Sequence, residues 1–157
     1  MKGLVVYYSK YGNGKIIAEA IASGLRETGH DIAVSDVGEK DTGPDFDFIV
    51  VGSPTRAGRM MGSVKRFIGR ELKQAAWKGK KFIAFGTGFR PKGSGKFDQM
   101  GAKSAEKVYD AIRKAGLEPM MEAQKFFVKD MQGPLEEGEQ ERAVELGRSV
   151  GRLIRTG

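Results

Sequence analysis

The sequence contains no cysteine and only one histidine, His30, among its 157 residues. Without cysteine the chain cannot form a disulfide framework, a thiol nucleophile, or a zinc or iron–sulfur site held by thiolates. A single histidine excludes a metal site built from three imidazoles and leaves a serine hydrolase triad one candidate base, located in a turn. We expect His30 to be a surface residue without a function. The lack of cysteine also fits a cytoplasmic location.

Long hydrophobic runs are also missing. No stretch approaches the roughly 18 consecutive apolar residues that a membrane-spanning helix needs. The apolar residues near the N-terminus are too few for a signal peptide and lack a small-residue cleavage site, so they predict a first strand. The length and a hydrophobic fraction of 39% are ordinary for a globular protein, and we expect a single domain over residues 1–157.

Acidic residues are scarce in the middle of the chain. Residues 56–103 contain 13 lysines and arginines but only 2 acidic residues, within a net charge of +7 for the chain. This segment is either a solubilising surface or a source of positive field that attracts an acidic partner or substrate. No recognised nucleic-acid-binding module accompanies the charge, so we expect no nucleic-acid partner.

Short apolar runs alternate with segments of helical periodicity along the chain. The predicted strands are 4–8, 32–37, 46–51, 82–85 and a fifth that includes 126–128. A first helix presents an apolar face formed by Ile16, Ile17, Ala20, Ile21 and Leu25. Further helices are predicted at 60–76, 97–115 and 136–154, the last with Ala143, Leu146, Val150 and Leu153 on one face. This alternation predicts an α/β fold with a parallel sheet.

Three polar, glycine-containing loops follow the predicted strands, at 9–14, 53–58 and 87–96. In folds of this class ligands bind at the carboxyl ends of the strands. The first loop reads SKYGNGK over residues 9–15 and leads into a helix. Because the first N–H groups of a helix have no partners and point outward, this arrangement predicts a phosphate site.

Three kinds of phosphate loop compete for this segment. A Walker A loop requires glycine where Ser9 stands and a hydroxyl where Ile16 stands, so a nucleotide hydrolase is disfavoured. A dinucleotide fingerprint keeps two glycines and an acid at Asp36, but Ile17 replaces its third glycine. The third kind encloses one terminal phosphomonoester with a hydroxyl from Ser9, backbone N–H groups and Asn13. We favour this third kind and keep the dinucleotide loop open as an alternative.

The order of hydroxyl, aromatic, glycine and asparagine in this loop resembles the phosphate loop of flavodoxins. The sequence GSPTRAGRM over residues 52–60 is similar to the flavin-ring loop of flavodoxin-like quinone oxidoreductases. The resemblance covers nearly the whole chain. It implies a three-layer, doubly wound α/β sandwich with a five-stranded parallel sheet in the order 2-1-3-4-5, and it implies FMN as the cofactor.

The resemblance also assigns residues to the three segments of the site. The phosphate would be held by Ser9, Lys10, Tyr11, Gly12, Asn13 and Gly14. The flavin ring would be lined by Ser53, Pro54, Thr55, Arg56, Ala57 and Gly58. The other side of the ring would be closed by Gly86, Thr87, Gly88 and Phe89. Flavodoxins usually have a hydroxyl residue where Gly14 stands, and the third segment lacks their stacking tyrosine, so Phe89 or Arg56 would stack on the ring.

Three functions fit this resemblance. The first is an electron carrier that binds FMN and shuttles electrons between redox enzymes. The second is an FMN-dependent NAD(P)H:quinone oxidoreductase, which the second loop favours and the short chain disfavours. The third is a binding module with a degraded flavin site. The expected partners are redox proteins, and the basic middle segment favours acidic ones.

Overall fold

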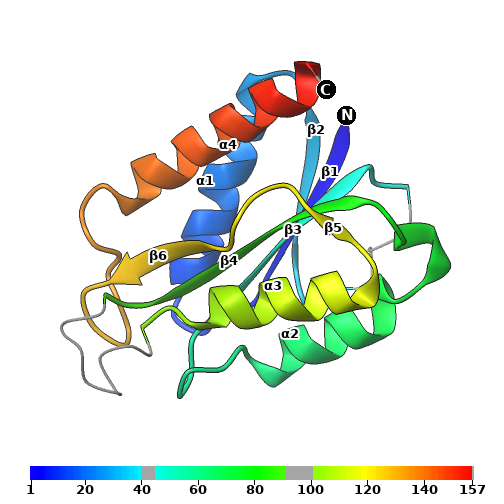
Figure 1. Cartoon of the computed structure of the whole chain (residues 1–157). Helices are drawn as coiled ribbons and strands as arrows, with labels where there is room; N and C mark the ends of the chain where they lie inside the picture. Colours follow the sequence, from blue (N-terminus) through cyan, green and yellow to red (C-terminus); the bar gives the residue numbers. More distant parts are fainter. Residues whose placement is uncertain (40–44, 91–100, 157) are drawn as a thin grey trace.

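A twisted parallel β-sheet forms the centre of the computed structural model, which describes residues 1–39, 45–90 and 101–156, and helices cover both of its faces (Figure 1). The strands are β1 (Lys2–Tyr7), β2 (Asp31–Asp36), β3 (Phe48–Pro54), β4 (Lys81–Phe89), β5 (Glu118–Pro119) and β6 (Gln124–Val128). The helices are α1 (Asn13–Glu27), α2 (Gly62–Phe67), α3 (Ser104–Ala115) and α4 (Glu139–Thr156). The strand order β2-β1-β3-β4-β5 confirms the predicted fold class.

The predicted fifth strand is two short strands, so the sheet has six strands instead of five. Both pair with the same edge of β4: Pro119 lies opposite Phe82, and Gln124 lies opposite Phe85. The four residues between Pro119 and Gln124 therefore face only two residues of β4, which is the geometry of a bulge. A two-residue strand carries no periodicity, so the sequence did not predict β5.

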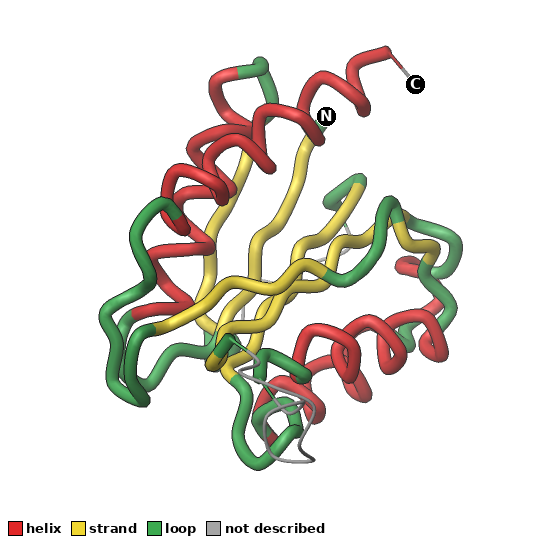
Figure 2. Tube along the Cα trace, turned by 60° about the vertical axis from the view of Figure 1, so that its left-hand side comes forward, coloured by secondary structure: helices red, strands yellow, loops and turns green. Residues whose placement is uncertain are grey.

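Two hydrophobic cores lie on the two sides of the sheet, beneath the two helical layers (Figure 2). One core packs α1 and α4 against the sheet, with Ile17, Ile21 and Leu25 fully buried. The other packs α2 and α3, with Leu72 and Trp77 buried. Because β1, β3 and β4 are covered on both faces, β1 and the first halves of β3 and β4 are continuous apolar runs, as is typical of parallel sheets.

Helices α1 and α4 lie side by side in contact through glycines (Figure 1). A Cβ atom on Gly147 would overlap the carbonyl oxygen of Ile21 and lie 3.0 Å from the Cα atom of Gly24. A Cβ atom on Gly151 would likewise overlap the side chain of Thr28. The two backbones can therefore approach this closely only because these positions lack side chains.

Several predicted boundaries differ from the structure. The helix predicted at 60–76 is α2, a π-helical turn η1 (Ile68–Leu72) and a 3₁₀ turn η2 (Ala75–Trp77). The helix predicted at 97–115 begins at Ser104 among the described residues, and α4 begins at Glu139 instead of 136. Within α1, Ile16 is exposed, as is Leu153 in α4, since the buried face of α4 runs through Ala143, Gly147 and Val150 instead.

The prediction that His30 lies on the surface is wrong. Its side chain is buried, and its Nε2 atom lies 2.8 Å from the carbonyl oxygen of Gly151. Its Nδ1 atom lies 3.0 Å from the N-terminal ammonium group of Met1. This histidine therefore ties the start of β2 to α4, a structural role. Separately, none of the helices in the described ranges is long and apolar enough to cross a membrane.

Candidate functional site

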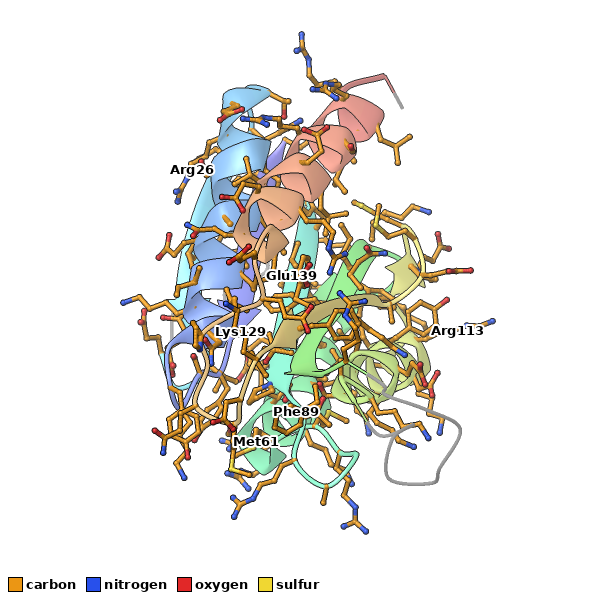
Figure 3. The ribbon with its side chains drawn as sticks, turned by 90° about the vertical axis from the view of Figure 1, so that its left-hand side faces the viewer. Arg26, Met61, Phe89, Arg113, Lys129 and Glu139 are labelled. Atoms are coloured by element: carbon orange, nitrogen blue, oxygen red, sulfur yellow. The ribbon has the colours of Figure 1, made fainter. Side chains whose placement is uncertain are left out.

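The ends of β1, β3 and β4 lie next to one another at the carboxyl edge of the sheet. Tyr7 at the end of β1 is opposite Gly52, and Pro54 at the end of β3 is opposite Thr87 in β4. Figure 3 shows Met61, which follows the second predicted segment, and Phe89, which ends the third, at the same end of the molecule. The structure therefore brings the three predicted segments to one edge, where ligands bind in this class of fold.

Helix α1 starts at Asn13 without a side-chain cap. Gly12 precedes it in the left-handed conformation, with φ 93°, which favours glycine. The N–H group of Ile16 donates to the carbonyl oxygen of Gly12 at 3.1 Å, which closes the first turn. The preceding N–H groups, at the open end of the helix, have no acceptor within that turn and carry the positive end of the helix dipole. This end of α1 is thus built to receive an anion.

Ser9 supplies a second donor beside this helix end. Its Oγ atom is buried and has no hydrogen-bond partner within the described ranges. A buried hydroxyl without a partner is rare because it has lost water without gaining a replacement bond. An anion at the start of α1 would provide the missing acceptor. Lys10 and Tyr11 are exposed beside it, with the Lys10 ammonium 5.4 Å from the centre of the Tyr11 ring.

Gly14 packs closely against the preceding loop. A Cβ atom at this position would lie 3.0 Å from the carbonyl oxygen of Tyr8 and 3.6 Å from Ser9 Oγ. The first distance is tighter than nine in ten real Cβ contacts, so any side chain at this position would require the Tyr8 carbonyl group to shift by a few tenths of an ångström. This chain therefore offers Ser9 and backbone N–H groups to an anion, with no hydroxyl from position 14.

The hydroxyl of Ser53 is already engaged inside the second segment. Ser53 Oγ accepts a hydrogen bond from the N–H group of Met61 at 2.9 Å and donates to the carbonyl oxygen of Pro54 at 2.9 Å. This side chain, which is almost fully buried, fixes the loop between β3 and α2. Ser53 and Pro54 therefore fix the backbone conformation of the second segment, which we call the ring segment because the resemblance assigns it to the flavin ring.

Thr55 is tied to a residue that the sequence did not indicate. Thr55 Oγ1 donates to Ser104 Oγ at 2.7 Å, and Ser104 Oγ donates to the carbonyl oxygen of Ser53 at 2.8 Å. The N–H group of Thr55 also donates to the carbonyl oxygen of Thr87 at 2.8 Å. Ser104 lies 49 positions from Thr55 at the start of α3, and no local pattern links the two. These bonds join the second segment to β4 and α3.

The tip of the second segment is a two-residue hairpin. Arg56 and Arg59 exchange two backbone hydrogen bonds, at 2.9 and 3.0 Å. Between them Ala57 and Gly58 both have positive φ, 51° and 76°, as in a type I′ turn. Arg56 and Ala57 are exposed and Gly58 is buried. The hairpin therefore presents a guanidinium and backbone groups at the site.

The third predicted segment is a strand and not a loop, which corrects the boundary at residue 85. Strand β4 continues through Gly86, Thr87 and Gly88 to Phe89, and β6 pairs with it along this length. A Cβ atom on either glycine would overlap residues 102–105, which cross the strand here. Both glycines are thus explained by packing. Thr87 is buried, whereas Phe89 is 43% exposed at the strand end. Positions 91–96 of the predicted loop lie outside the described residues.

A fourth segment at this edge, the loop between β6 and α4, has no counterpart in the sequence prediction. It is closed by an antiparallel bridge between Val128 and Leu135. Gly133, with φ 98°, lies so close to α1 that a Cβ atom on it would be 2.6 Å from Asn13 Oδ1. The only local signal was a glycine before a proline, which indicates a turn but not a contact. This loop covers one side of the predicted phosphate segment.

The electrostatics of the edge are set by neighbouring side chains. Burial, reinforced by the nearby charges of Asp36, Glu19 and Glu39, raises the pKa of Tyr7 above its ordinary value, so its phenol stays neutral. Arg90 donates to Glu136 at 3.0 and 3.1 Å, and its guanidinium lies 4.3 Å from the centre of the Phe127 ring. Within the described ranges, no cluster of three histidine or acidic residues suits a metal ion.

The family model and the solved structures that match this chain both indicate a flavodoxin fold. A family model described as a flavodoxin domain matches residues 4–126. A flavodoxin from the domain Archaea superimposes with a TM-score of 0.81 and 23% identity over 99% of both chains. A flavodoxin, WrbA-like protein from Agrobacterium tumefaciens gives a TM-score of 0.71 and 21% identity over 99% of this chain and 98% of that one. At these identities the structural likeness establishes the fold.

Relatives in sequence include enzymes. An NAD(P)H dehydrogenase (quinone) from Caulobacter vibrioides is 34% identical over an alignment that covers 42% of this chain and 44% of the relative. A protein from Rhizobium meliloti with the name NAD(P)H dehydrogenase (quinone) 3 is 33% identical, over 43% of this chain and 42% of the relative. The chain thus matches less than half the length of these curated relatives.

Proposed function

This chain belongs to the flavodoxin domain family, and from that membership we propose that it binds FMN and carries electrons between redox enzymes. The fold of this family implies a flavin site. When bound, the isoalloxazine ring supplies the redox chemistry, since it takes up and releases electrons. The residues of this chain hold the cofactor, orient it and leave part of it accessible.

The observation that carries the proposal is the buried, unpartnered hydroxyl of Ser9 beside the open end of α1. The residues present fit a phosphomonoester, because the unpartnered hydroxyl of Ser9 lies beside the first turn of α1, 3.6 Å from where a Cβ atom on Gly14 would stand. A pyrophosphate fits less well, because Ile17, which stands where the dinucleotide fingerprint has its third glycine, is fully buried.

The residues that follow β3 and end β4 fit a planar ring. Arg56 is exposed on the hairpin and Phe89 is partly exposed at the end of β4, and both a guanidinium and a phenyl ring stack on aromatic planes. Gly58 allows the peptide bond before it to reorient, because glycine has no Cβ atom to clash. The hydroxyl network of Ser53, Thr55 and Ser104 keeps the base of the segment rigid.

Electron carriage is favoured over substrate reduction by the composition of the three predicted segments. None of the predicted site residues carries a carboxylate or an imidazole. A quinone reductase needs a proton donor for its product, and these groups are the usual donors. A quinone oxidoreductase is the second candidate, and the names of the curated relatives support it. Tyr11, whose exposed hydroxyl is part of the first segment, is the available donor in that case.

Titration of the apoprotein with FMN tests the binding site. We expect Ser9→Ala to weaken FMN affinity about tenfold or more, because a hydrogen bond to a charged group contributes about 1.5–3 kcal/mol. Ser63→Ala is the matched control: its Oγ is also buried and without a partner in the described ranges, but it lies in α2. We expect it to change the affinity less than twofold. Equal affinity of wild type and Ser9→Ala would favour the dinucleotide loop instead.

Anaerobic mixing of the FMN-loaded protein with NADPH separates the two functions. A carrier keeps its oxidised flavin absorbance until a partner reductase is added. Rapid bleaching by NADPH alone would establish the quinone oxidoreductase instead. A protein that retains no flavin absorbance after incubation with FMN and removal of the unbound FMN is neither.

A further inference from the structure

The exposed face of the helical segment 62–73 consists entirely of cations and glycines. Its exposed positions are Gly62, Lys65, Arg66, Gly69, Arg70 and Lys73. The only acidic residue in the segment, Glu71, is half-buried and accepts a hydrogen bond from Gln74 at 3.2 Å. We call the four cations Lys65, Arg66, Arg70 and Lys73 the α2 basic face.

These four side chains make no ion pair in the described part of the chain. Other arginines of the molecule do: Arg90 pairs with Glu136, Arg142 with Glu139, and Arg148 with Glu27. In the described part of the chain, seven lysines and arginines take part in the ion pairs found there. What distinguishes the α2 basic face is that four unpaired cations share one helical segment, where an external anion could meet them together.

The stability of the helical segment 62–73 does not explain why its exposed face consists of cations and glycines. Arg66 and Arg70 are four positions apart, and like charges at that spacing on a helix repel each other. A Cβ atom on Gly69 would touch nothing within 4 Å, so packing does not require glycine there. Glycine weakens a helix relative to alanine. The face is thus both self-repelling and smooth, and each feature favours close approach of a partner over stability of the isolated chain.

The α2 basic face continues directly into the candidate site. The N–H group of Met61, the residue before α2, donates to Ser53 Oγ in the ring segment. Arg59 is exposed on the adjoining hairpin and adds a fifth cation with no ion pair in the described part of the chain. A partner seated on α2 would therefore lie beside the segment that we assign to the flavin ring.

We propose that the α2 basic face docks an acidic redox protein, and this proposal rests on the function proposed above. Complementary charge at the rim of a site speeds association and orients the partner. A protein is favoured over nucleic acid because the sequence contains no recognised nucleic-acid-binding module.

Titration with an acidic plant-type [2Fe–2S] ferredoxin as the probe tests the proposal. We expect binding at low ionic strength that is lost at 500 mM salt, and a dissociation constant raised fivefold or more in the double variant Arg66→Gln/Arg70→Gln. The matched control, Arg113→Gln/Lys114→Gln, removes two exposed charges from the far end of α3 and should change the constant less than twofold. FMN affinity should be the same in all three proteins.

Two outcomes would overturn the proposal. If both double variants weaken ferredoxin binding equally, the net charge of the protein, and not the α2 basic face, would explain the weakening. Weaker binding of a duplex DNA oligonucleotide to Arg66→Gln/Arg70→Gln, with ferredoxin binding unchanged, would assign the face to nucleic acid. Failure of the apoprotein to bind FMN would refute the proposed function only, since ferredoxin binding to the apoprotein still measures docking.

Discussion

At the scale of single residues, the contact between Asn13 and Gly133 joins two segments that are distant in the sequence. Gly133 lies against the Asn13 side chain with no room for a Cβ atom. Asn13 opens α1, where we place the phosphate. The loop that contains Gly133 therefore limits where the Asn13 side chain can lie.

Gly133→Ala should weaken FMN affinity about threefold to tenfold, because the new methyl group must displace Asn13. Gly138→Ala is the matched control, since Gly138 also has positive φ, 84°, but faces open space. Each variant places alanine in the left-handed region at a cost of roughly 1–2 kcal/mol in unfolding free energy. Urea titration should show similar losses of stability, and FMN titration should separate the two. Equal FMN affinities would contradict the role of this contact.

Glu139 is the residue whose protonation most directly affects the edge strand β6. It is buried, accepts a hydrogen bond from Phe127 N–H at 2.8 Å, and accepts from Arg142 at 2.8 and 3.0 Å. Arg142 also donates to the carbonyl oxygen of Lys125. Burial raises the pKa of Glu139, but the bonds from Arg142 and Phe127 and the charges of Arg142 and Arg90 outweigh it, so the pKa lies below its ordinary value of 4.5.

Because the folded-state pKa is the lower one, Glu139 stabilises the fold above about pH 4.5, and this contribution is lost as the pH falls through the folded value. Glu139→Gln should lower the unfolding free energy by about 1–3 kcal/mol at pH 7, and by less as the pH falls through the folded pKa. Glu137→Gln, at a side chain 95% exposed, should have almost no effect at pH 7 or at lower pH. Urea titrations at pH 7 and at a series of pH values below 4.5 measure the unfolding free energies. A loss of stability in Glu139→Gln that does not change with pH would contradict this prediction.

At the scale of elements, the sequence predicted the strands better than their ends. Strands β1, β3 and the first half of β4 are buried on both faces, so each is a continuous apolar run. The second half of β4 contains Gly86 and Gly88 because residues 102–105 cross the strand there, and small residues close together are typical of a loop. Packing by a distant segment produced this pattern, and local sequence cannot distinguish the two causes.

The same limit applies to the candidate site. The phosphate segment was predicted from its own glycine, hydroxyl and helix-start pattern, whereas the second segment was assigned through a family resemblance and its hairpin at Ala57 and Gly58 was not predicted. The bonds of Ser104 to Thr55, and the contact of Gly133 with Asn13, depend on tertiary structure. These contacts can be identified only from the three-dimensional structure.

Packing of α1 on α4 should be sensitive to any side chain at Gly147. Gly147→Ala should lower the unfolding free energy by about 1–3 kcal/mol or more, because the methyl group would overlap the backbone of α1, which cannot move aside like a flexible side chain. Gly69→Ala, at a helical glycine in open space, should leave stability unchanged or raise it by up to about 1 kcal/mol. Urea titration compares the two. Equal effects would show that helix propensity, and not close packing, dominates.

At the scale of the whole molecule, positive charge is concentrated where the flavin would be reduced. Reduction adds negative charge, which nearby cations stabilise. A unit charge about 10 Å away in water contributes about 0.4 kcal/mol, or on the order of 15–20 mV for one electron.

Neutralising Arg59 and Lys65 with glutamine should therefore make the midpoint potential of the bound flavin more negative by about 15–20 mV per charge at low salt. Potentiometric titration measures the shift. The pair Arg113→Gln/Lys114→Gln, on α3, should shift it less. An identical shift for both pairs would mean that the net charge of the protein, and not its distribution, sets the potential.

The bulge between β5 and β6 makes this protein well suited to site-specific labelling. The chain has no cysteine, so a cysteine introduced anywhere would be its only thiol. Glu122 lies in the bulge with an exposed side chain, and four residues there face only two of β4. A fluorophore or spin probe attached at position 122 would occupy the edge of the sheet without replacing any residue assigned to the cofactor or to the α2 basic face.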